Sequence, residues 1–277
     1  MTDSGATFRA LHRPGDPFTL MNVWDRGGAK VAAALGAEAL ATSSAAHAFV
    51  LGKADMGHIT RDEALAHAAD IVAATPLPVS GDFENGFGDA PEDVAETVRL
   101  AGEIGLAGCS IEDTNMADHS AYDFDLAVER IKAASAAARA LGRDFVLVAR
   151  ADGIMNRAYD VDEAFARLQA FDAAGADCLY APMPRSIDDL KRLVNASAKP
   201  FNALAAGKFA KLSRAEFAAL GVARISLGSS LARITNHVLI DTARRILSDG
   251  DFTDFLTASD FDTVDDLMRG DHTKQET

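Results

Sequence analysis

The chain has 277 residues with 48% hydrophobic content, enough to bury the core of one large domain or two small ones. It carries 27 Lys and Arg against 41 Asp and Glu, a formal net charge of −14, and no basic patch of the kind that binds nucleic acid is evident. No apolar run is long enough to span a membrane, and the first residues lack the pattern of a signal peptide. Cys109 and Cys178 each lie in an apolar run, so we expect two buried free thiols and a cytoplasmic protein.

Eight short apolar runs, each followed by a helical pattern, make up most of the chain. After a polar lead-in over residues 1–19, the predicted strands cover residues 20–23, 39–42, 77–81, 107–111, 145–149, 177–181, 200–204 and 224–228. The predicted helices cover residues 29–35, 60–74, 90–104, 126–141, 161–173 and 186–194, with one more from about residue 213. A Thr60-x-x-Glu63 capping box marks the start of the second helix.

This alternation predicts an α/β fold, a (β/α)₈ TIM-like barrel formed as a single domain over residues 1–277. The alternative is an open doubly wound sheet, but no G-x-G-x-x-G motif follows the first strand. Beyond the eighth strand, residues 231–277 form a C-terminal helical extension, with helical patterns at 231–248 and near 252–257 and 263–268. A plain barrel needs one helix there, so we expect the surplus to pack on another subunit.

The stretch from Leu77 to Gly88 carries two carboxylates at the end of a predicted strand. In an extended backbone the side chains at i and i+2 point the same way, so Asp82 and Glu84 are expected to face one site. Two acids that converge in this way repel each other unless a cation lies between them. Mg²⁺ suits such a site, because it prefers oxygen ligands and keeps several of its waters.

The ends of other predicted strands are also polar. In a barrel of this kind the carboxyl ends of the strands and the loops after them hold the active site. Four carboxylates, Asp55, Asp82, Glu84 and Glu112, form a set that can hold Mg²⁺ directly or through its waters. Arg150 can take a substrate carboxylate with its two-pronged guanidinium, and Ser43 with the backbone N–H groups after it can hold another anionic oxygen.

Several motifs resemble one known family. They are Asn22-Val-Trp-Asp25, Ala41-Thr-Ser-Ser44, Leu51-Gly-x-x-Asp55, Asp82-Phe-Glu84-x-Gly86-Phe-Gly88, Ile111-Glu-Asp113 and Ala149-Arg150-x-Asp152. Together they are similar to the isocitrate lyase/phosphoenolpyruvate mutase superfamily, from about Phe8 to Ile246. The resemblance implies a barrel whose last helix is swapped between subunits, and therefore a homodimer or homotetramer. It also implies Mg²⁺, with Mn²⁺ as a substitute, and a 2-oxo acid or enolate as ligand.

The resemblance also assigns roles by matched motif. Asp82 is implied as the main metal ligand, and three other acids contact the metal through water: Asp55, Glu84 and Glu112. Asp55, Glu112 and Arg150 are also implied as catalytic residues. The substrate carboxylate is expected to be held by Ser43, Ser44, Ala45 and Arg150. Asn202 fits a substrate-binding position of the family, and Trp24 is expected to wall the pocket.

The sequence departs from the family after the fourth strand. The lyases that act on isocitrate and methylisocitrate carry a K-K/R-C-G-H loop there, whereas this chain has the loop Thr114–Asp123 without Cys or Lys. Those two activities are therefore not expected. His119 and Tyr122 of this loop are the candidates for proton transfer, and its ten mostly small or polar residues are expected to form a mobile gate over the metal site.

These features together predict a Mg²⁺-dependent lyase that cleaves a C–C bond of a small 2-oxo or 2-hydroxy carboxylic acid through an enolate, with an oxaloacetate- or malate-like substrate. One alternative is a hydrolase or mutase that acts on the P–C bond of phosphonopyruvate or phosphoenolpyruvate. A second alternative is a non-catalytic barrel that binds metal and an oxo acid. Four converging carboxylates argue against the second alternative, because they are costly to hold together without a metal.

Overall fold

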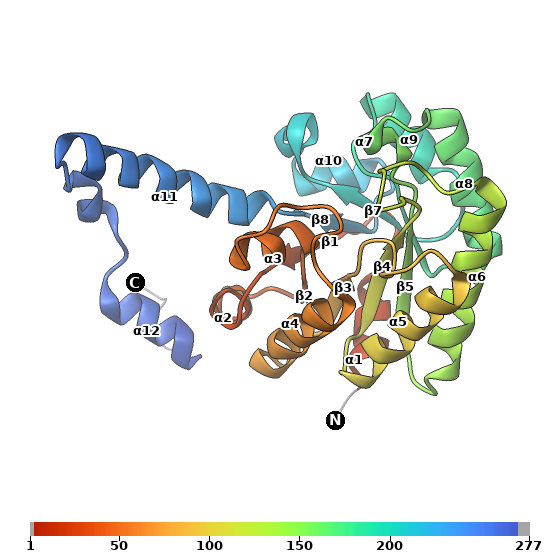
Figure 1. The fold of residues 1–277 in the computed structure, drawn as a ribbon, viewed down its shortest axis with the longest axis horizontal. Helices are drawn as coiled ribbons and strands as arrows, with labels where there is room; N and C mark the ends of the chain where they lie inside the picture. Colours follow the sequence, from red (N-terminus) through yellow and green to blue (C-terminus); the bar gives the residue numbers. More distant parts are fainter. Residues whose placement is uncertain (1–2, 271–277) are drawn as a thin grey trace.

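The computed structural model describes residues 3–270, and within them eight parallel strands close into one barrel in the order β1 to β8 (Figure 1). The (β/α)₈ prediction is confirmed. The strands are β1 (Phe18–Asn22), β2 (Ala39–Ala41), β3 (Val79–Asp82), β4 (Gly108–Glu112), β5 (Val146–Arg150), β6 (Cys178–Tyr180), β7 (Phe201–Leu204) and β8 (Arg224–Ser226). They begin and end within about two residues of the predicted runs, because parallel strands buried on both faces read as continuous apolar segments.

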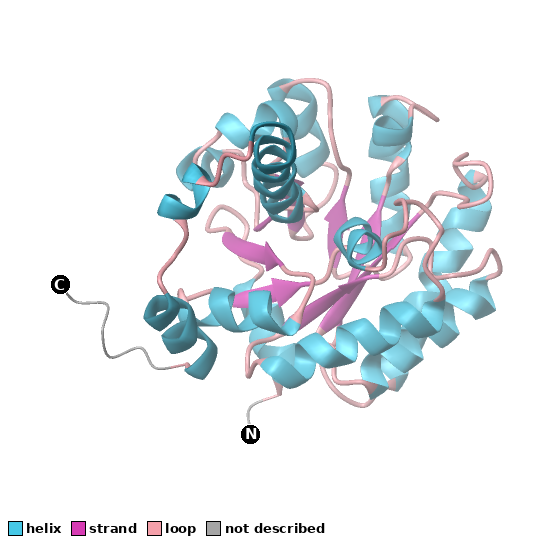
Figure 2. Cartoon of the chain, turned by 60° about the vertical axis from the view of Figure 1, so that its left-hand side comes forward, coloured by secondary structure: helices cyan, strands magenta, loops and turns pink. Residues whose placement is uncertain are grey.

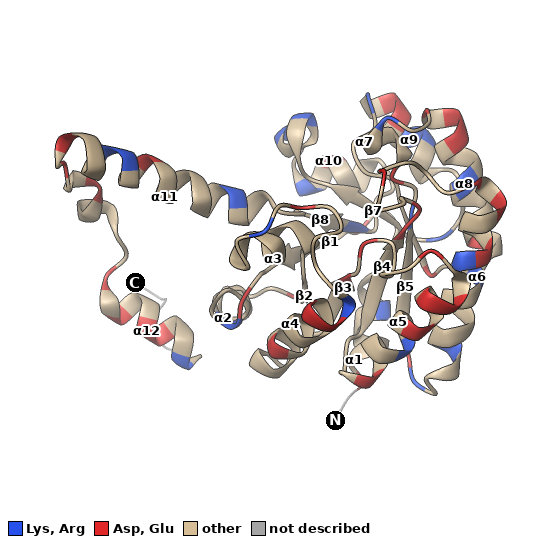
Figure 3. Ribbon diagram, in the orientation of Figure 1, with Lys and Arg blue, Asp and Glu red and all other residues tan. Residues whose placement is uncertain are grey.

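Helices surround the strands on the outside (Figure 2). The helical segments before β8 are α1 (Ser4–Leu11), α2 (Arg26–Ala34), α3 (Ser44–Val50), α4 (Arg61–Ala74), α5 (Pro91–Glu103), α6 (Phe124–Ala140), α7 (Gly153–Asn156), α8 (Val161–Ala173), α9 (Ile187–Val194), η1 (Gly207–Lys211) and α10 (Arg214–Ala219). The capping box at Thr60 and Glu63 is present. Lys and Arg alternate with Asp and Glu over these outer helices (Figure 3).

The polar lead-in before β1, for which no helix was predicted, contains one. Residues 4–11 form α1, whose first turn is capped by the carboxylate of Asp3. Phe8 is fully buried in one apolar cluster with Phe18 of β1 and Val146 of β5, which stand at the amino-terminal ends of their strands. Helix α1 therefore closes the end of the barrel opposite the strands' carboxyl ends.

Strand register sets the polar residues of β4 to β8 side by side. Glu112 pairs with Arg150, Arg150 with Tyr180, Tyr180 with Asn202, and Asn202 with Arg224. Because alternate residues of a strand face the same side, one wall of the barrel interior is polar from β4 round to β8. Cys109 and Cys178 are buried free thiols, as predicted.

The chain after β8 continues as α11 (Ser230–Asp249), η2 (Thr253–Thr257) and α12 (Phe261–Arg269). Figure 1 shows α11 projecting away from the barrel, with α12 returning toward α2. Lys30 of α2 donates a hydrogen bond to the carbonyl oxygen of Met268. Of the helices within residues 3–270, none has the length and apolar character needed to cross a bilayer. The predicted single domain over residues 1–277 includes residues 1–2 and 271–277, which lie outside the described residues.

Candidate active site

A cavity of about 160 Å³ opens among the carboxyl ends of the strands. Its lining brings together side chains from loops and strands far apart in the sequence, among them Ser43, Ser44, Asp55, Asp82, Ser110, Arg150, Tyr180, Arg224 and Ser226. Six of the residues predicted for the site lie in this lining: Ser43, Ser44, Ala45, Asp55, Asp82 and Arg150. The sequence motifs thus converge on the mouth of the barrel.

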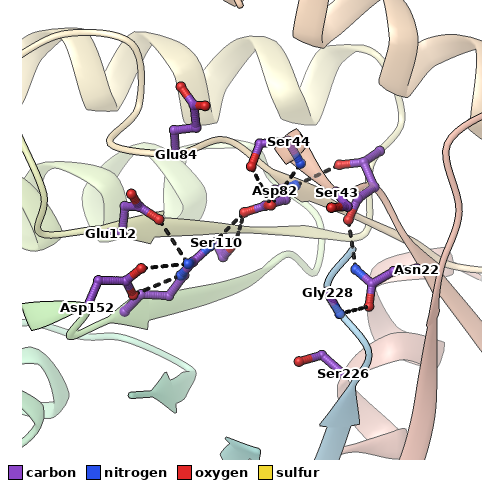
Figure 4. A network of polar contacts seen from close by, with 12 residues as sticks. Asn22, Ser43, Ser44, Asp82, Glu84, Ser110, Glu112, Asp152, Ser226 and Gly228 are labelled. Atoms are coloured by element: carbon purple, nitrogen blue, oxygen red, sulfur yellow. Dashed lines mark hydrogen bonds and ion pairs between the residues drawn. The ribbon is translucent and has the colours of Figure 1, made fainter. Parts of the chain in front are cut away.

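Asp82 is the last residue of β3 and the most heavily hydrogen-bonded acid of the cavity (Figure 4). Its Oδ2 accepts bonds from the backbone N–H and the hydroxyl of Ser44, each at 3.0 Å. Its Oδ1 accepts from Ser110 Oγ at 3.2 Å and from Arg150 Nη1 at 2.7 Å. Ser44 begins α3, so the N–H that bonds Asp82 belongs to the first turn of that helix.

Arg150, the last residue of β5, is surrounded by three carboxylates. Its Nη2 lies 2.6 Å from Asp152 Oδ2 and 2.9 Å from Glu112 Oε2, and its Nη1 reaches Asp82. Burial alone would lower the pKa of Arg150, but these carboxylates outweigh it and hold the pKa well above its usual value. Burial raises the pKa of Glu112 well above its usual value, although Arg150 opposes this. Because every nitrogen of Arg150 already has a partner, a substrate carboxylate must share or replace one of these bonds.

A second layer of contacts fixes the backbone that carries Arg150. Asp113 Oδ1 accepts from the N–H of Asp152 at 2.8 Å, and its Oδ2 accepts from Tyr159 at 2.7 Å and Arg167 at 3.0 Å. Burial raises the pKa of Asp113 to about 6, although the Tyr159 hydroxyl and Arg167 oppose this. Asp113 therefore links the ends of β4 and β5 to α8, and it holds the backbone two residues after Arg150.

Glu84 does not reach the site in the way the extended-strand argument assumed. Strand β3 ends at Asp82, and Glu84 adopts a left-handed backbone with φ of 45°, so the side chains of the two acids do not run parallel. Figure 4 shows the carboxylate of Glu84 turned away from Asp82. It accepts a bond from the N–H of Gly57 at 3.2 Å, and burial raises its pKa to about 7, with Asp82 and Asp55 adding to the rise.

Asp55 lies in the loop after α3, and its Oδ1 accepts a hydrogen bond from the N–H of Met56 at 2.9 Å. Burial raises its pKa, and the charge of Asp82 adds to this effect. The acids predicted to bind metal therefore lie close enough together for the charge of one to raise the pKa of another. Within residues 3–270, however, no group of three His, Cys, Asp or Glu side chains has the arrangement of a metal-binding site.

The loop Thr114–Asp123 carries the two candidates for proton transfer, and neither lies in the cavity lining. Tyr122 is 5% exposed and donates to Asp89 Oδ1 at 2.5 Å, while its oxygen accepts from Asn85 at 2.8 Å. Burial and Asp89 raise its pKa to about 12. His119 lies on the outer surface in a shallow depression that also includes Asp118. The loop is held by a backbone bridge between residues 114 and 121, and its role as a gate stays a prediction.

Two predicted substrate-binding residues, Asn202 and Trp24, are not part of the cavity lining. Asn202 is fully buried, where it donates to Ser226 Oγ at 2.9 Å and accepts from Arg224 Nε at 3.0 Å. Trp24 offers its carbonyl oxygen to the ring of His67 at 2.8 Å. Ser43 caps α3 by accepting from the N–H of Ala46 at 3.3 Å. The hydroxyl oxygen of Ser43 therefore already accepts one hydrogen bond from the helix.

Several side chains that the structure places around the cavity were given no role by the sequence analysis. Asp152 was part of a quoted motif without a role, and the i, i+2 spacing from Arg150 could have indicated their pairing. Asn22 donates to Thr42 and accepts from the N–H groups of Leu227 and Gly228, which closes the seam between β1 and β8. His47 and His67 stack with ring centroids 3.8 Å apart behind Asp82, and burial lowers the pKa of both.

The family model for phosphoenolpyruvate phosphomutase matches residues 8–247. The 2,3-dimethylmalate lyase of Eubacterium barkeri is 32% identical over 207 residues, which is 70% of this chain and 68% of that protein. The oxaloacetate decarboxylase of Chromohalobacter salexigens is 31% identical over 222 residues, covering 78% of this chain and 75% of that protein. A solved structure from Burkholderia cenocepacia J2315, described only provisionally as a lyase/mutase, has a TM-score of 0.90 at 45% identity, covering 95% of this chain and 94% of that chain.

These matches span nearly the whole barrel and include every strand that contributes to the cavity. They agree with the motifs at the strand ends. The chain therefore belongs to the phosphoenolpyruvate phosphomutase family, in the isocitrate lyase/phosphoenolpyruvate mutase superfamily of lyases and mutases.

Proposed function

We propose that the protein is a Mg²⁺-dependent lyase that cleaves a C–C bond of a small 2-oxo or 2-hydroxy carboxylic acid and leaves an enolate. The observation that carries the proposal is the arrangement of Asp82 and Arg150 on one cavity, 2.7 Å apart and fixed by further hydrogen bonds. An acid cluster and a buried guanidinium together suit a ligand that carries a carboxylate and binds a cation at the same time.

The acids fit Mg²⁺ by their chemistry. All the donors are carboxylate oxygens, and their mutual charge contributes to the raised pKa values of Asp55 and Glu84. Since Mg²⁺ keeps several waters, a set without a closed protein cage suits it. Asp82 would hold the metal directly, and Asp55, Glu84 and Glu112 would contact it through water. When bound, the metal would draw electron density from the 2-oxo acid and favour the charge that develops on bond cleavage.

Side chains and backbone groups of the chain would place the substrate and stabilise the enolate. Arg150 would place the substrate carboxylate, helped by Ser44 and the backbone N–H groups at the start of α3. Asp152 and Asp113 would keep the guanidinium of Arg150 in place while it exchanges partners. Preorganised charges of this kind stabilise the developing enolate, because they need no rearrangement as the bond breaks. His119 and Tyr122 remain candidates for proton transfer only if the loop that carries them moves.

The names of the relatives support C–C cleavage over the alternatives. A dimethylmalate lyase and an oxaloacetate decarboxylase both act on carboxylic acids at C–C bonds, and each is more than 30% identical to this chain. The family name keeps the P–C alternative open, as a hydrolase or mutase of phosphonopyruvate or phosphoenolpyruvate. A non-catalytic barrel that binds an oxo acid is the third candidate, and only a search for turnover separates it from the first two.

We further propose that the C-terminal helices join this chain to others in a homodimer or homotetramer. Helix α11 and the residues after it expose large apolar side chains, among them Leu239 at 66%, Leu247 at 85%, Leu256 at 87% and Phe261 at 91%. A monomer gains nothing by holding so many apolar groups in water. A terminal helix exchanged between subunits would cover them.

The test of the function is a substrate screen with the purified protein. Oxaloacetate, malates with and without methyl groups, and phosphonopyruvate are each incubated with Mg²⁺, and products are followed by NMR. We expect a C–C cleavage product from at least one dicarboxylate and none in the presence of EDTA. Release of phosphate from phosphonopyruvate alone would support the P–C alternative instead.

A further inference from the structure

Arg224 is a buried cation on the wall of the cavity, and none of the roles above uses it. It is the first residue of β8, is 4% exposed, and lines the cavity together with Ser226. Residues two apart on a strand face the same side, so both side chains belong to the barrel interior. Arg224 stands deeper than Ser226, and its guanidinium lies 5.9 Å from the ring of Phe8, on the helix that closes the far end.

The guanidinium of Arg224 is incompletely paired. Its Nε donates to Asn202 Oδ1 at 3.0 Å, whereas its Nη1 is buried and has no hydrogen-bond partner in the described part of the chain. No ion pair joins it to a carboxylate within residues 3–270. Burial lowers its pKa. The thiol of Cys178 beside it is neutral, since burial raises its pKa to about 11, and burial with the Arg224 charge lowers the pKa of His12 to about 3.

The two buried arginines of the cavity differ in their surroundings. Arg150 has three carboxylates within 2.9 Å. Arg224 instead donates to the amide oxygen of Asn202, and its Nη1 has no partner among the described residues. A buried charge is costly unless it is paired, so a guanidinium without an anion indicates that the anion comes from outside the chain. A methionine would fill the same space beside Phe8 without that cost.

We infer that Arg224 binds a second anionic group of the substrate, a carboxylate or a phosphonate at the far end of the acid whose first carboxylate lies at Arg150. The inference rests on the proposed function and adds the residue that would bind the second anionic end of its substrate. The cavity of about 160 Å³ is lined by both arginines, so one small molecule can reach both. Arg224 is then a specificity-determining residue, because an acid with a methyl group at the same end would leave its charge unpaired.

The experiment compares ligands with and without an anionic group at the far end. Isothermal titration with Mg²⁺ present measures the affinities of 2-oxopentanoate, 2-oxoglutarate and phosphonopyruvate, with oxalate as a ligand too short to reach Arg224. We expect the wild type to prefer one of the two dianionic ligands over 2-oxopentanoate by about 10-fold or more. Arg224→Met should abolish the preference and leave the oxalate affinity unchanged. Arg233→Met, which removes an exposed arginine of α11, should behave as the wild type.

Each outcome decides one question. Preference for 2-oxoglutarate assigns the far group as a carboxylate, and preference for phosphonopyruvate assigns it as a phosphonate. Oxalate that binds while the wild type shows no preference, or a preference that survives in Arg224→Met, overturns the inference and leaves the proposed function standing. Failure of oxalate to bind with Mg²⁺ overturns the proposed function and the inference with it. If Arg224→Met does not fold, Arg224→Gln takes its place, and the wild-type preference remains decisive.

Discussion

Asp82 Oδ1 and Arg150 Nη1 lie 2.7 Å apart, so the strongest candidate for the metal ligand is paired with the strongest candidate for the substrate clamp. A metal bound to Asp82 would therefore share the carboxylate of Asp82 with Arg150. Because the two residues share this contact, a substitution of either one is expected to disturb the cavity.

Replacing Asp82 with Asn should remove metal binding and activity together. The amide keeps the size of the side chain, but it loses the charge that attracts Mg²⁺ and balances Arg150. We expect kcat/KM to fall by more than about 100-fold, as when a preorganised charge is removed from an active site. Titration with Mn²⁺ and turnover assays with and without EDTA measure the two effects. Asp125→Asn, at an exposed site of α6, is the matched control, and full activity of Asp82→Asn in chelator would rule out the assignment.

Tyr122→Phe should affect stability more than catalysis. The hydroxyl of Tyr122 bonds Asp89 and Asn85, and its ring lies under the guanidinium of Arg130, whose Cζ is 4.1 Å from the ring centroid. Arg130 in turn donates to the backbone carbonyl oxygens of Gly88 and Asn85, in the loop after β3. Loss of the hydroxyl leaves the buried amide of Asn85 without this acceptor, at a cost of about 1–3 kcal/mol in the free energy of unfolding.

Urea unfolding and steady-state kinetics of the same Tyr122→Phe sample separate the two effects. We expect kcat within about twofold of the wild type, because one hydrogen bond in a supporting loop displaces the site little. His119→Gln, on the outside of the same loop, should change neither quantity. A large loss of kcat at unchanged stability would instead place the Tyr122 hydroxyl in proton transfer and support the gate.

The barrel was predictable from the sequence because each buried parallel strand is a short apolar run between helical patterns. The short helices α1, α3 and α7 were missed, since four to eight residues give little periodicity. The contact between Tyr122 and Asp89 joins residues 33 positions apart, and nothing local indicates it. Arg224 reads in sequence as a polar residue at a strand boundary. Only closure of the barrel shows that its side chain faces inward.

The apolar surface of α11 should hold the protein in an oligomer. Sedimentation velocity at micromolar concentration is expected to show a dimer or tetramer in place of a species of 29.2 kDa. Leu239→Asp should shift the protein toward the monomer, because it places a charge in the surface that the partner would cover. Leu35→Asp, at an equally exposed site on the barrel, should not. A wild type that sediments only as a monomer would refute the helix exchange.

The last prediction concerns His12, which should make the fold less stable in mild acid. Its ring is buried between Phe8 and Phe18, with centroids 4.7 and 5.1 Å away, and its Nδ1 donates to the carbonyl oxygen of Phe8 at 2.8 Å. Its Nε2 is buried without a partner among the described residues. Burial is the main reason that its pKa falls to about 3, and the charges of Arg224 and Arg9 add to this, with Asp177 opposing.

The direction of this pH dependence follows from the number of protons that His12 binds in the folded and in the unfolded protein. Above pH 6.5 the ring is neutral in both states and His12 adds no pH dependence. Below pH 6.5 the unfolded chain takes a proton that the folded protein refuses until about pH 3, so the free energy of unfolding falls as the pH falls through this window. At pH 5 the loss from this residue is about 2 kcal/mol. His12→Asn keeps a donor for Phe8 but cannot take the proton, so urea unfolding at pH 7, 6 and 5 should give it a shallower dependence than the wild type. Its lower stability at pH 7, from lost ring packing, does not affect the comparison of slopes, and parallel slopes would show that His12 is protonated in the folded protein.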